Sequence, residues 1–153
     1  MATGSVNARK HGITQHFGED PATYKKFGYK GHPGIDTGQK YRQYVYAEEN
    51  GTVKNTYTND PTAGNYVVIK SPRSTTTYLE WRFLHLSSFL VKPGQKIKRG
   101  DPIGRAGSTG YSTAVHNHED MTPRFRVWPY APLYPLNGYK GKKDPKFYLD
   151  NKY

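Results

Sequence analysis

The chain contains no cysteine, which excludes disulfide bonds, thiolate zinc sites and a cysteine nucleophile. No apolar run approaches the ~20 residues of a membrane-spanning helix, so we expect no membrane span. The first ten residues hold no apolar segment of the kind that a signal peptide requires, so we expect no signal peptide. Any transition metal would have to be bound by histidine, aspartate or glutamate.

Apolar residues are also scarce, at 34% of the sequence against a usual share of about 45–50%. Fourteen tyrosines partly compensate, because each brings a large apolar ring. Glycine and proline are frequent, with 16 and 11 residues among 153. This frequency of glycine and proline favours short strands joined by turns over a helical bundle. The length of the chain fits one domain.

The sequence has 23 lysines and arginines against 12 aspartates and glutamates, which gives a formal net charge of +11. Such a charge attracts polyanions and speeds encounter with them, but it says nothing about the fold. Nucleic acid, an anionic cell-wall polymer and an acidic membrane are all compatible with it, and so is a solvated surface without a partner. Charge alone does not choose among them.

The β-branched and aromatic residues gather in short segments between turns, which predicts an all-β fold in a single domain. Residues 1–12 are polar and lack periodicity, so we expect an N-terminal arm. Residues 13–121 form the predicted β-rich core, and residues 122–153 are expected to be an extended C-terminal tail with little regular structure, rich in proline and tyrosine. The predicted strands cover 13–18, 44–47, 51–57, 64–70, 75–86 and 115–121, with two short ones within 91–107.

A His-x-His pair in the last predicted strand is the most informative local pattern. Residues two apart on a strand point to the same face, so His116, His118 and Asp120 should line up. The intervening Asn117 and Glu119 should belong to the outward face. Two imidazoles and a carboxylate on one face suit either a metal or a proton-transfer site.

A second imidazole and carboxylate occur in Gly31-His-Pro-Gly-Ile-Asp36, where the proline and glycine between them exclude a helical arrangement. His85 follows at the end of another β-rich run. Each signal is weak alone, but two histidines and one aspartate suit a catalytic zinc with an open position. Two further histidines would then remain for acid–base work.

Competing sites fit less well. The chain has no His-Glu-x-x-His, which excludes a helical zincin, and no Gly-Lys-Ser/Thr of a phosphate-binding loop. A cupin would carry a glutamate where Thr122 and Pro123 stand. The segment Gly107-Ser-Thr-Gly110 lacks a nucleophile-elbow pattern.

In this order the motifs resemble the lysostaphin-type zinc endopeptidases of peptidoglycan, also described as LytM-domain or β-lytic metallopeptidase-like enzymes. The resemblance covers roughly residues 13–121. The matching segments are 15–18, 31–36, 47–53, 64–69, 85–87, 91–104, 107–113 and 116–118.

The resemblance implies that His32, Asp36 and His118 bind one Zn²⁺ and that His85 and His116 form the catalytic pair. It also implies a β-rich fold of the duplicated hybrid motif type, with an antiparallel core sheet and a groove.

The chain departs from the family where the usual Ser-Thr-Gly-Pro-His-Leu-His-Phe-Glu would end. Asn117 and Glu119 replace apolar residues of that pattern, which we expect to alter packing more than metal chemistry. Asp120 keeps an acid on the inward face, one methylene shorter than glutamate.

The function that the resemblance implies is a zinc metalloendopeptidase that hydrolyses stem or cross-link peptide bonds of bacterial peptidoglycan. Without a leader, we expect a phage endolysin released at host lysis or an enzyme carried on the virion, with other virion proteins as further partners. Nucleic acid is not an expected partner. The alternatives are a catalytically silent domain of a phage particle, a nucleic-acid-binding β-barrel and a lipoyl-type carrier domain, although the carrier's modified-lysine turn is missing.

Overall fold

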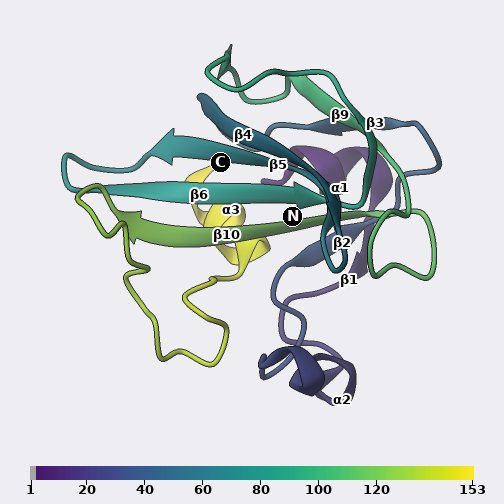
Figure 1. The fold of residues 1–153 in the computed structure, drawn as a ribbon, viewed down its shortest axis with the longest axis horizontal. Coiled ribbons are helices and arrows are strands. Elements are labelled where there is room, and N and C mark those ends of the chain that lie inside the picture. Colours follow the sequence, from purple (N-terminus) through teal and green to yellow (C-terminus); the bar gives the residue numbers. More distant parts are fainter. Residues whose placement is uncertain (1–2) are drawn as a thin grey trace.

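The computed structural model describes residues 3–153, and two antiparallel sheets dominate it (Figure 1). The larger sheet has the strand order β1-β2-β10-β6-β5-β4-β8, and the smaller has the order β3-β9-β7. The strands are β1 (Ile13–Gln15), β2 (Ile35–Thr37), β3 (Tyr44–Tyr46), β4 (Gly51–Asp60), β5 (Gly64–Pro72), β6 (Thr77–Leu84), β7 (Leu86–Phe89), β8 (Lys96–Ile97), β9 (Pro102–Ala106) and β10 (Asn117–Phe125). The helices are α1 (Val6–His11), α2 (Pro21–Tyr24), a 3-10 turn η1 (Lys25–Phe27) and α3 (Pro145–Lys152).

The hydrophobic core lies between the two sheets and α3, and it follows from strand alternation. On β6, Leu79, Trp81 and Phe83 share one face and each is at most 1% exposed. The same core takes Ile103 from β9 and Leu149 from α3, both fully buried. The all-β single domain predicted from the sequence is confirmed.

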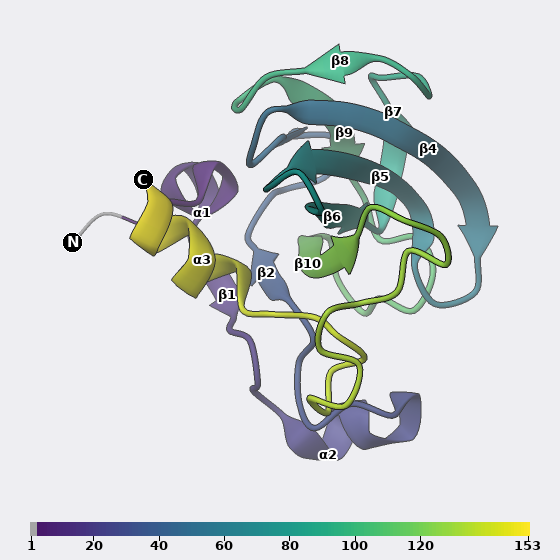
Figure 2. The ribbon, with the colours of Figure 1, turned by 90° about the vertical axis from the view of Figure 1, so that its left-hand side faces the viewer.

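The chain ends in more regular structure than the sequence analysis expects. β10 continues to Phe125, and α3 begins at Pro145 after Asp144, whose carboxylate accepts the backbone N–H of Lys146 at 2.9 Å. An N-cap aspartate followed by proline is a helix-start signal that the high proline content masked. In Figure 2, α1 and α3 lie on the same side of the large sheet.

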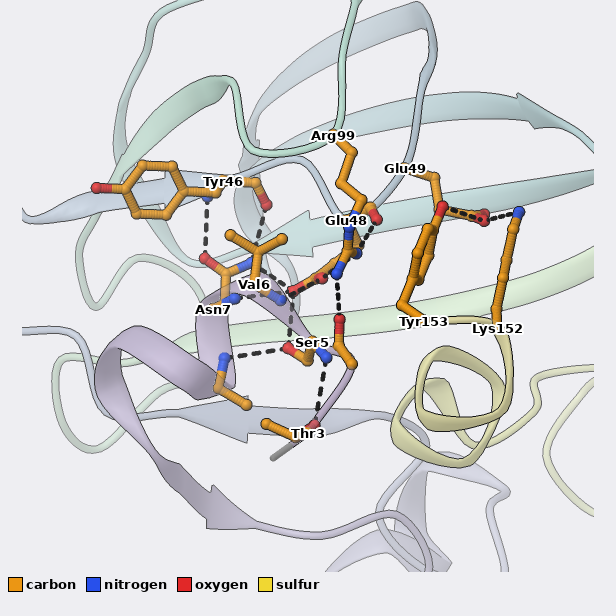
Figure 3. Close-up of polar contacts among 12 residues, drawn as sticks. Thr3, Ser5, Val6, Asn7, Tyr46, Glu48, Glu49, Arg99, Lys152 and Tyr153 are labelled. Carbon is orange, nitrogen blue, oxygen red and sulfur yellow. Dashed lines mark hydrogen bonds and ion pairs between the residues drawn. The ribbon is translucent and has the colours of Figure 1, made fainter. Parts of the chain in front are cut away.

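Helix α1 forms within residues 1–12 because its N-terminus is capped twice (Figure 3). The Ser5 hydroxyl accepts the N–H of Ala8 at 3.0 Å, and the Glu48 carboxylate accepts the N–H groups of Val6 and Asn7 at 2.7 and 3.0 Å. Glu48 is 1% exposed, so these bonds are shielded from water. A distant residue therefore stabilises this short helix.

Asn117 and Glu119 lie on the opposite face of β10 from His118, as expected, and this face is covered by other residues and not exposed to solvent. Both are fully buried, and the Asn117 amide donates to Glu119 Oε2 at 3.1 Å. Asn7 of α1 donates to the same oxygen at 2.9 Å. The polar residues at these positions thus join β10 to α1, which covers that face.

No helix within residues 3–153 is long and apolar enough to cross a membrane.

Candidate metal centre and its cleft

The strand register brings three predicted ligands together. Asp36 on β2 pairs directly with His118 on β10, and His32 lies in the turn that leads into β2. His118 Nδ1 lies 2.9 Å from both Asp36 Oδ1 and His32 Nε2, and His32 Nε2 lies 3.1 Å from Asp36 Oδ1. The three side chains each offer one ligand atom, and within residues 3–153 they are the group whose ligand atoms lie close enough together to hold a metal ion.

The cluster fits a tetrahedral zinc ion. Bonds of about 2.0–2.1 Å place tetrahedral ligand atoms about 3.3 Å apart, close to the separations seen here. The outer nitrogens face the kinds of oxygen that usually support metal-bound imidazoles. His32 Nδ1 donates to the carbonyl oxygen of His16 at 3.0 Å, and His118 Nε2 lies 3.4 Å from Asp120 Oδ2.

The same contacts set the ionisation of the ligands. Burial alone would raise the pKa of Asp36, but its hydrogen bonds to His118 and His32 outweigh this and hold that pKa below its usual range. Burial would lower the pKa of His118, yet the carboxylates of Asp120 and Asp36 raise it to about 9. A cation that binds at Nδ1 therefore takes the place of a proton.

The predicted catalytic histidines lie next to the cluster, with ring centroids 4.9 Å apart. His85 Nδ1 donates to the carbonyl oxygen of Thr109 at 2.7 Å, and His116 Nδ1 donates to that of Ala114 at 2.8 Å. Each Nδ1 is thus occupied, which leaves the Nε2 atoms for chemistry. His116 Nε2 lies 3.6 Å from Asp36 Oδ2, so one imidazole reaches the ligand set directly.

His85 occupies an unusual backbone position. Its φ of +63° lies in the left-handed region, and it stands between β6 of the large sheet and β7 of the small sheet. Burial, followed by the nearby charge of His118, lowers the pKa of His85 to about 4. This imidazole is therefore neutral at pH 7 and able to accept a proton at Nε2.

The two histidines and the ligand cluster open into a cleft of about 470 Å³. Its walls come from α2 with η1, from the loop before β10, and from the sheet floor. Lys26 donates to the hydroxyl of Tyr111, and the rings of Phe27 and Tyr111 meet edge to face, so the two loops touch at the cleft. The lining residues include Tyr24, Phe27, Tyr29, Thr62, Arg82, Leu84, Tyr111, Ser112 and Thr113.

Two cleft residues were missed by the sequence analysis. The Tyr24 ring lies 5.0 Å from the His32 ring, and its hydroxyl donates to Gln15 Oε1 at 2.7 Å. Arg82 lies on the sheet floor beside Asp120. Neither position belongs to a motif, and Arg82 becomes recognisable only when the β6–β10 register is known.

Two histidines and an aspartate that meet in an open cleft suit a metal ion with a free coordination position. The chain belongs to peptidase family M23, whose family model matches residues 30–124. The resemblance to lysostaphin-type enzymes noted from the motifs is therefore confirmed at the level of the family.

The relatives agree with this assignment. The peptidoglycan DD-endopeptidase ShyA of Vibrio cholerae is 43% identical over 95 residues, which cover 62% of this chain and 21% of ShyA. A zinc-containing peptidase from Vibrio cholerae has 34% identity and a TM-score of 0.58, covering 71% of this chain and 32% of the other. The chain thus spans about a fifth to a third of these proteins.

The catalytic domain of lysostaphin from Staphylococcus simulans shares the fold over nearly the whole chain. Its TM-score is 0.70, and the match covers 97% of this chain and 98% of that domain. Because the identity is only 22%, this likeness speaks for the fold alone.

Proposed function

We propose that this protein is a zinc-dependent endopeptidase that cleaves peptide bonds in bacterial peptidoglycan. The observation that carries the proposal is the convergence of His32, Asp36 and His118 at ligand distances beside two further imidazoles. Membership in family M23 and the likeness to a peptidoglycan DD-endopeptidase support the substrate class.

His32, Asp36 and His118 would hold one zinc ion, which supplies a Lewis acid that polarises a carbonyl oxygen and makes water more acidic. His85, neutral in its buried position, is suited to take up a proton at Nε2. His116 faces it and can stabilise negative charge on the attacked carbonyl or protonate the leaving amine through its own Nε2. The two roles can be exchanged between these histidines.

The place of action is proposed to be the bacterial cell wall, where the net charge of +11 favours contact with anionic polymers. Release at host lysis or carriage on a phage particle stays a prediction from the sequence. Proteomic analysis of purified particles and of the lysate would distinguish these two routes, and recovery in neither would contradict both.

The test is digestion of purified peptidoglycan with untreated, chelator-treated and zinc-restored protein. New amino groups without new reducing sugar ends are expected from the untreated and restored samples, and mass spectrometry of the fragments identifies the bond. Reducing ends would indicate a glycosidase. An intact wall together with bound zinc would support the catalytically silent domain instead.

A further inference from the structure

Arg82 is a cleft residue to which the proposed chemistry gives no role. Its side chain lies on the sheet floor and is 27% exposed. Its Nε and Nη2 atoms donate to the carboxylate of Asp120 at 2.9 and 2.6 Å, while Nη1 has no hydrogen-bond partner within residues 3–153. The guanidinium is therefore fixed on one edge and still open to the cleft.

The surroundings of Arg82 carry an excess of positive charge. Asp120 is fully buried, and the charges of Arg82 and Lys142 both act on it. Lys142 is only 7% exposed and makes no ion pair within the described part of the chain. The one carboxylate that pairs with Arg82 thus also feels the charge of Lys142, and an anion placed at the open edge of Arg82 would be stabilised.

The other carboxylate on this face cannot supply the missing charge. Glu80 already lies 3.2 Å from the Arg124 guanidinium and 3.4 Å from Lys54 Nζ. The Nη1 edge of Arg82, which Asp120 does not contact, is therefore left for a group that enters the cleft.

The register of β6 and β10 fixes how far Arg82 lies from the metal ligands. Arg82 pairs with Asp120, and Leu84, two residues further along β6, pairs with His118. Two residues of a strand span about 6.6 Å. An extended peptide bound over the ligand cluster would therefore reach Arg82 with a group one or two residues from the bond at the metal centre.

The chemistry of the site selects a carboxylate. A guanidinium offers a planar pair of N–H donors that matches carboxylate geometry, and Asp120 already fixes its plane. The Tyr66 ring lies 5.9 Å from the guanidinium carbon, and Tyr29 lines the same cleft as Arg82. The positive charge near Arg82, its planar pair of donors and its distance from the metal ligands all favour a carboxylate.

We propose that Arg82 forms a carboxylate-binding subsite that recognises a free carboxylate one or two residues from the scissile bond of the peptide substrate. The inference rests on the proposed peptidase function. The carboxylate belongs either to a side chain of the stem peptide or to its chain end, and substrate variants distinguish these sources.

The experiment uses a synthetic cross-linked stem-peptide dimer in three forms: unmodified, amidated only at the chain end, and amidated only at the side-chain carboxylate. Wild-type kcat/KM should fall about 10- to 100-fold for one amidated form, the usual range for a hydrogen-bonded charge pair. Arg82→Gln should lose the same factor on the unmodified dimer but little on that amide. Arg82→Lys should keep part of the preference, and Arg73→Gln, at an exposed arginine, should keep all of it.

Zinc content and thermal unfolding of each variant separate recognition from folding. Equal losses on all three dimers would mean that Arg82 acts only by holding Asp120, and would overturn the subsite. Equal wild-type rates on all three would do the same while leaving the peptidase function intact.

If no dimer is cleaved, the proposed function fails but the subsite can still be measured. Titration calorimetry of the three dimers is done with the His116→Ala variant and with the double variant that also carries Arg82→Gln. It measures binding without turnover. A carboxylate preference that disappears with Arg82 would support the subsite, and its absence would contradict it.

Discussion

His32, Asp36 and His118 meet because β2 and β10 are neighbours in the large sheet, and each imidazole is oriented from its outer nitrogen. His32 Nδ1 donates to the backbone carbonyl of His16, while His118 Nε2 faces the Asp120 carboxylate at 3.4 Å. A mutation can therefore remove a metal-ligating imidazole without removing the group that faces its outer nitrogen, or the reverse. This distinction makes the metal assignment testable at single residues.

His118→Ala should lose most bound zinc, because two of three protein ligands seldom hold the ion at micromolar concentrations. His16→Ala should retain zinc, since only its backbone oxygen contacts His32 and its side chain is exposed. Elemental analysis after gel filtration measures both. Equal zinc content in His118→Ala and wild type would exclude the proposed ligand set.

His85 and His116 should behave as catalytic groups and not as ligands. His85→Asn and His116→Ala should keep zinc while the rate of peptide cleavage falls about 10²–10⁴-fold, as for other acid–base groups. Asparagine is chosen at position 85 because it tolerates the left-handed backbone found there. A His85→Asn enzyme with wild-type turnover would remove His85 from the mechanism.

At the scale of elements, the turn from His32 into β2 depends on a close backbone approach at Gly34. A Cβ atom there would collide with the carbonyl oxygen of Glu119 and lie 2.9 Å from His118 Nε2. The turn and β10 therefore pack too closely for any side chain at this position. The glycine in the His-Pro-Gly-Ile-Asp motif is needed for packing between elements.

Gly34→Ala should destabilise the fold by about 1–3 kcal/mol, the usual cost of overpacking, and should weaken zinc binding by moving His118. Chemical denaturation with and without zinc measures both effects. The loss should be larger with zinc present, because the metal stabilises only the undistorted site. If the free energy of unfolding of Gly34→Ala equalled that of wild type with and without zinc, the turn would accommodate a methyl group without cost.

The opposite face of β10 carries a carboxyl group whose ionisation is coupled to folding. Burial and the neighbouring Glu48 raise the pKa of Glu119 well above its usual value of 4.5. A folded-state pKa above the unfolded one stabilises the fold below the unfolded pKa, and this contribution is lost as pH rises towards the folded value. Glu119 thus opposes stability in alkaline solution.

Glu119→Gln should remove this dependence. Relative to wild type, its free energy of unfolding should rise with pH above about 4.5, because the unfolded wild-type chain loses the Glu119 proton before the folded one does. Glu19→Gln, at an exposed position, should follow wild type at every pH. Urea denaturation between pH 5 and pH 9 makes the comparison, and parallel curves for all three proteins would contradict the coupling.

These elements also show what the sequence could and could not predict. The His-x-His and His-x-x-x-Asp motifs lie on or next to strands, so their convergence follows from period-two alternation and a family resemblance. The roles of Arg82 and Glu48 depend on strand register and on where α1 docks, and neither leaves a local pattern. The burial of Asn117 and Glu119 beneath α1 could not be predicted either, because docking by a six-residue helix leaves no periodic signal in β10.

At the scale of the whole molecule, the N-terminal segment contacts the C-terminal helix. Asp150 of α3 accepts the backbone N–H of Gly4 at 2.7 Å and the hydroxyl of Thr3 at 2.8 Å. Glu49 contacts Lys152 nearby, as Figure 3 shows. Neither α1 nor α3 contributes a lining residue to the cleft, which lies between α2 with η1 and the loop before β10.

The net charge acts on the same scale and separates wall binding from catalysis. With 23 basic and 12 acidic residues, attraction to an anionic wall should weaken as salt rises, because charges on the surface are screened beyond about 8 Å at physiological ionic strength. The cleft histidines and the metal cluster are largely buried, so their interactions are screened much less.

Sedimentation of the protein with intact cell walls should therefore fall steeply between 50 and about 500 mM salt. Turnover of a short soluble peptide without net charge should change less than about threefold over the same range, since it depends on the cleft and not on the surface field. A double substitution of exposed lysines, Lys92→Gln with Lys96→Gln, should lower wall binding at low salt without changing that turnover. Wall binding that is insensitive to salt would show that recognition lies in specific contacts and not in the overall charge.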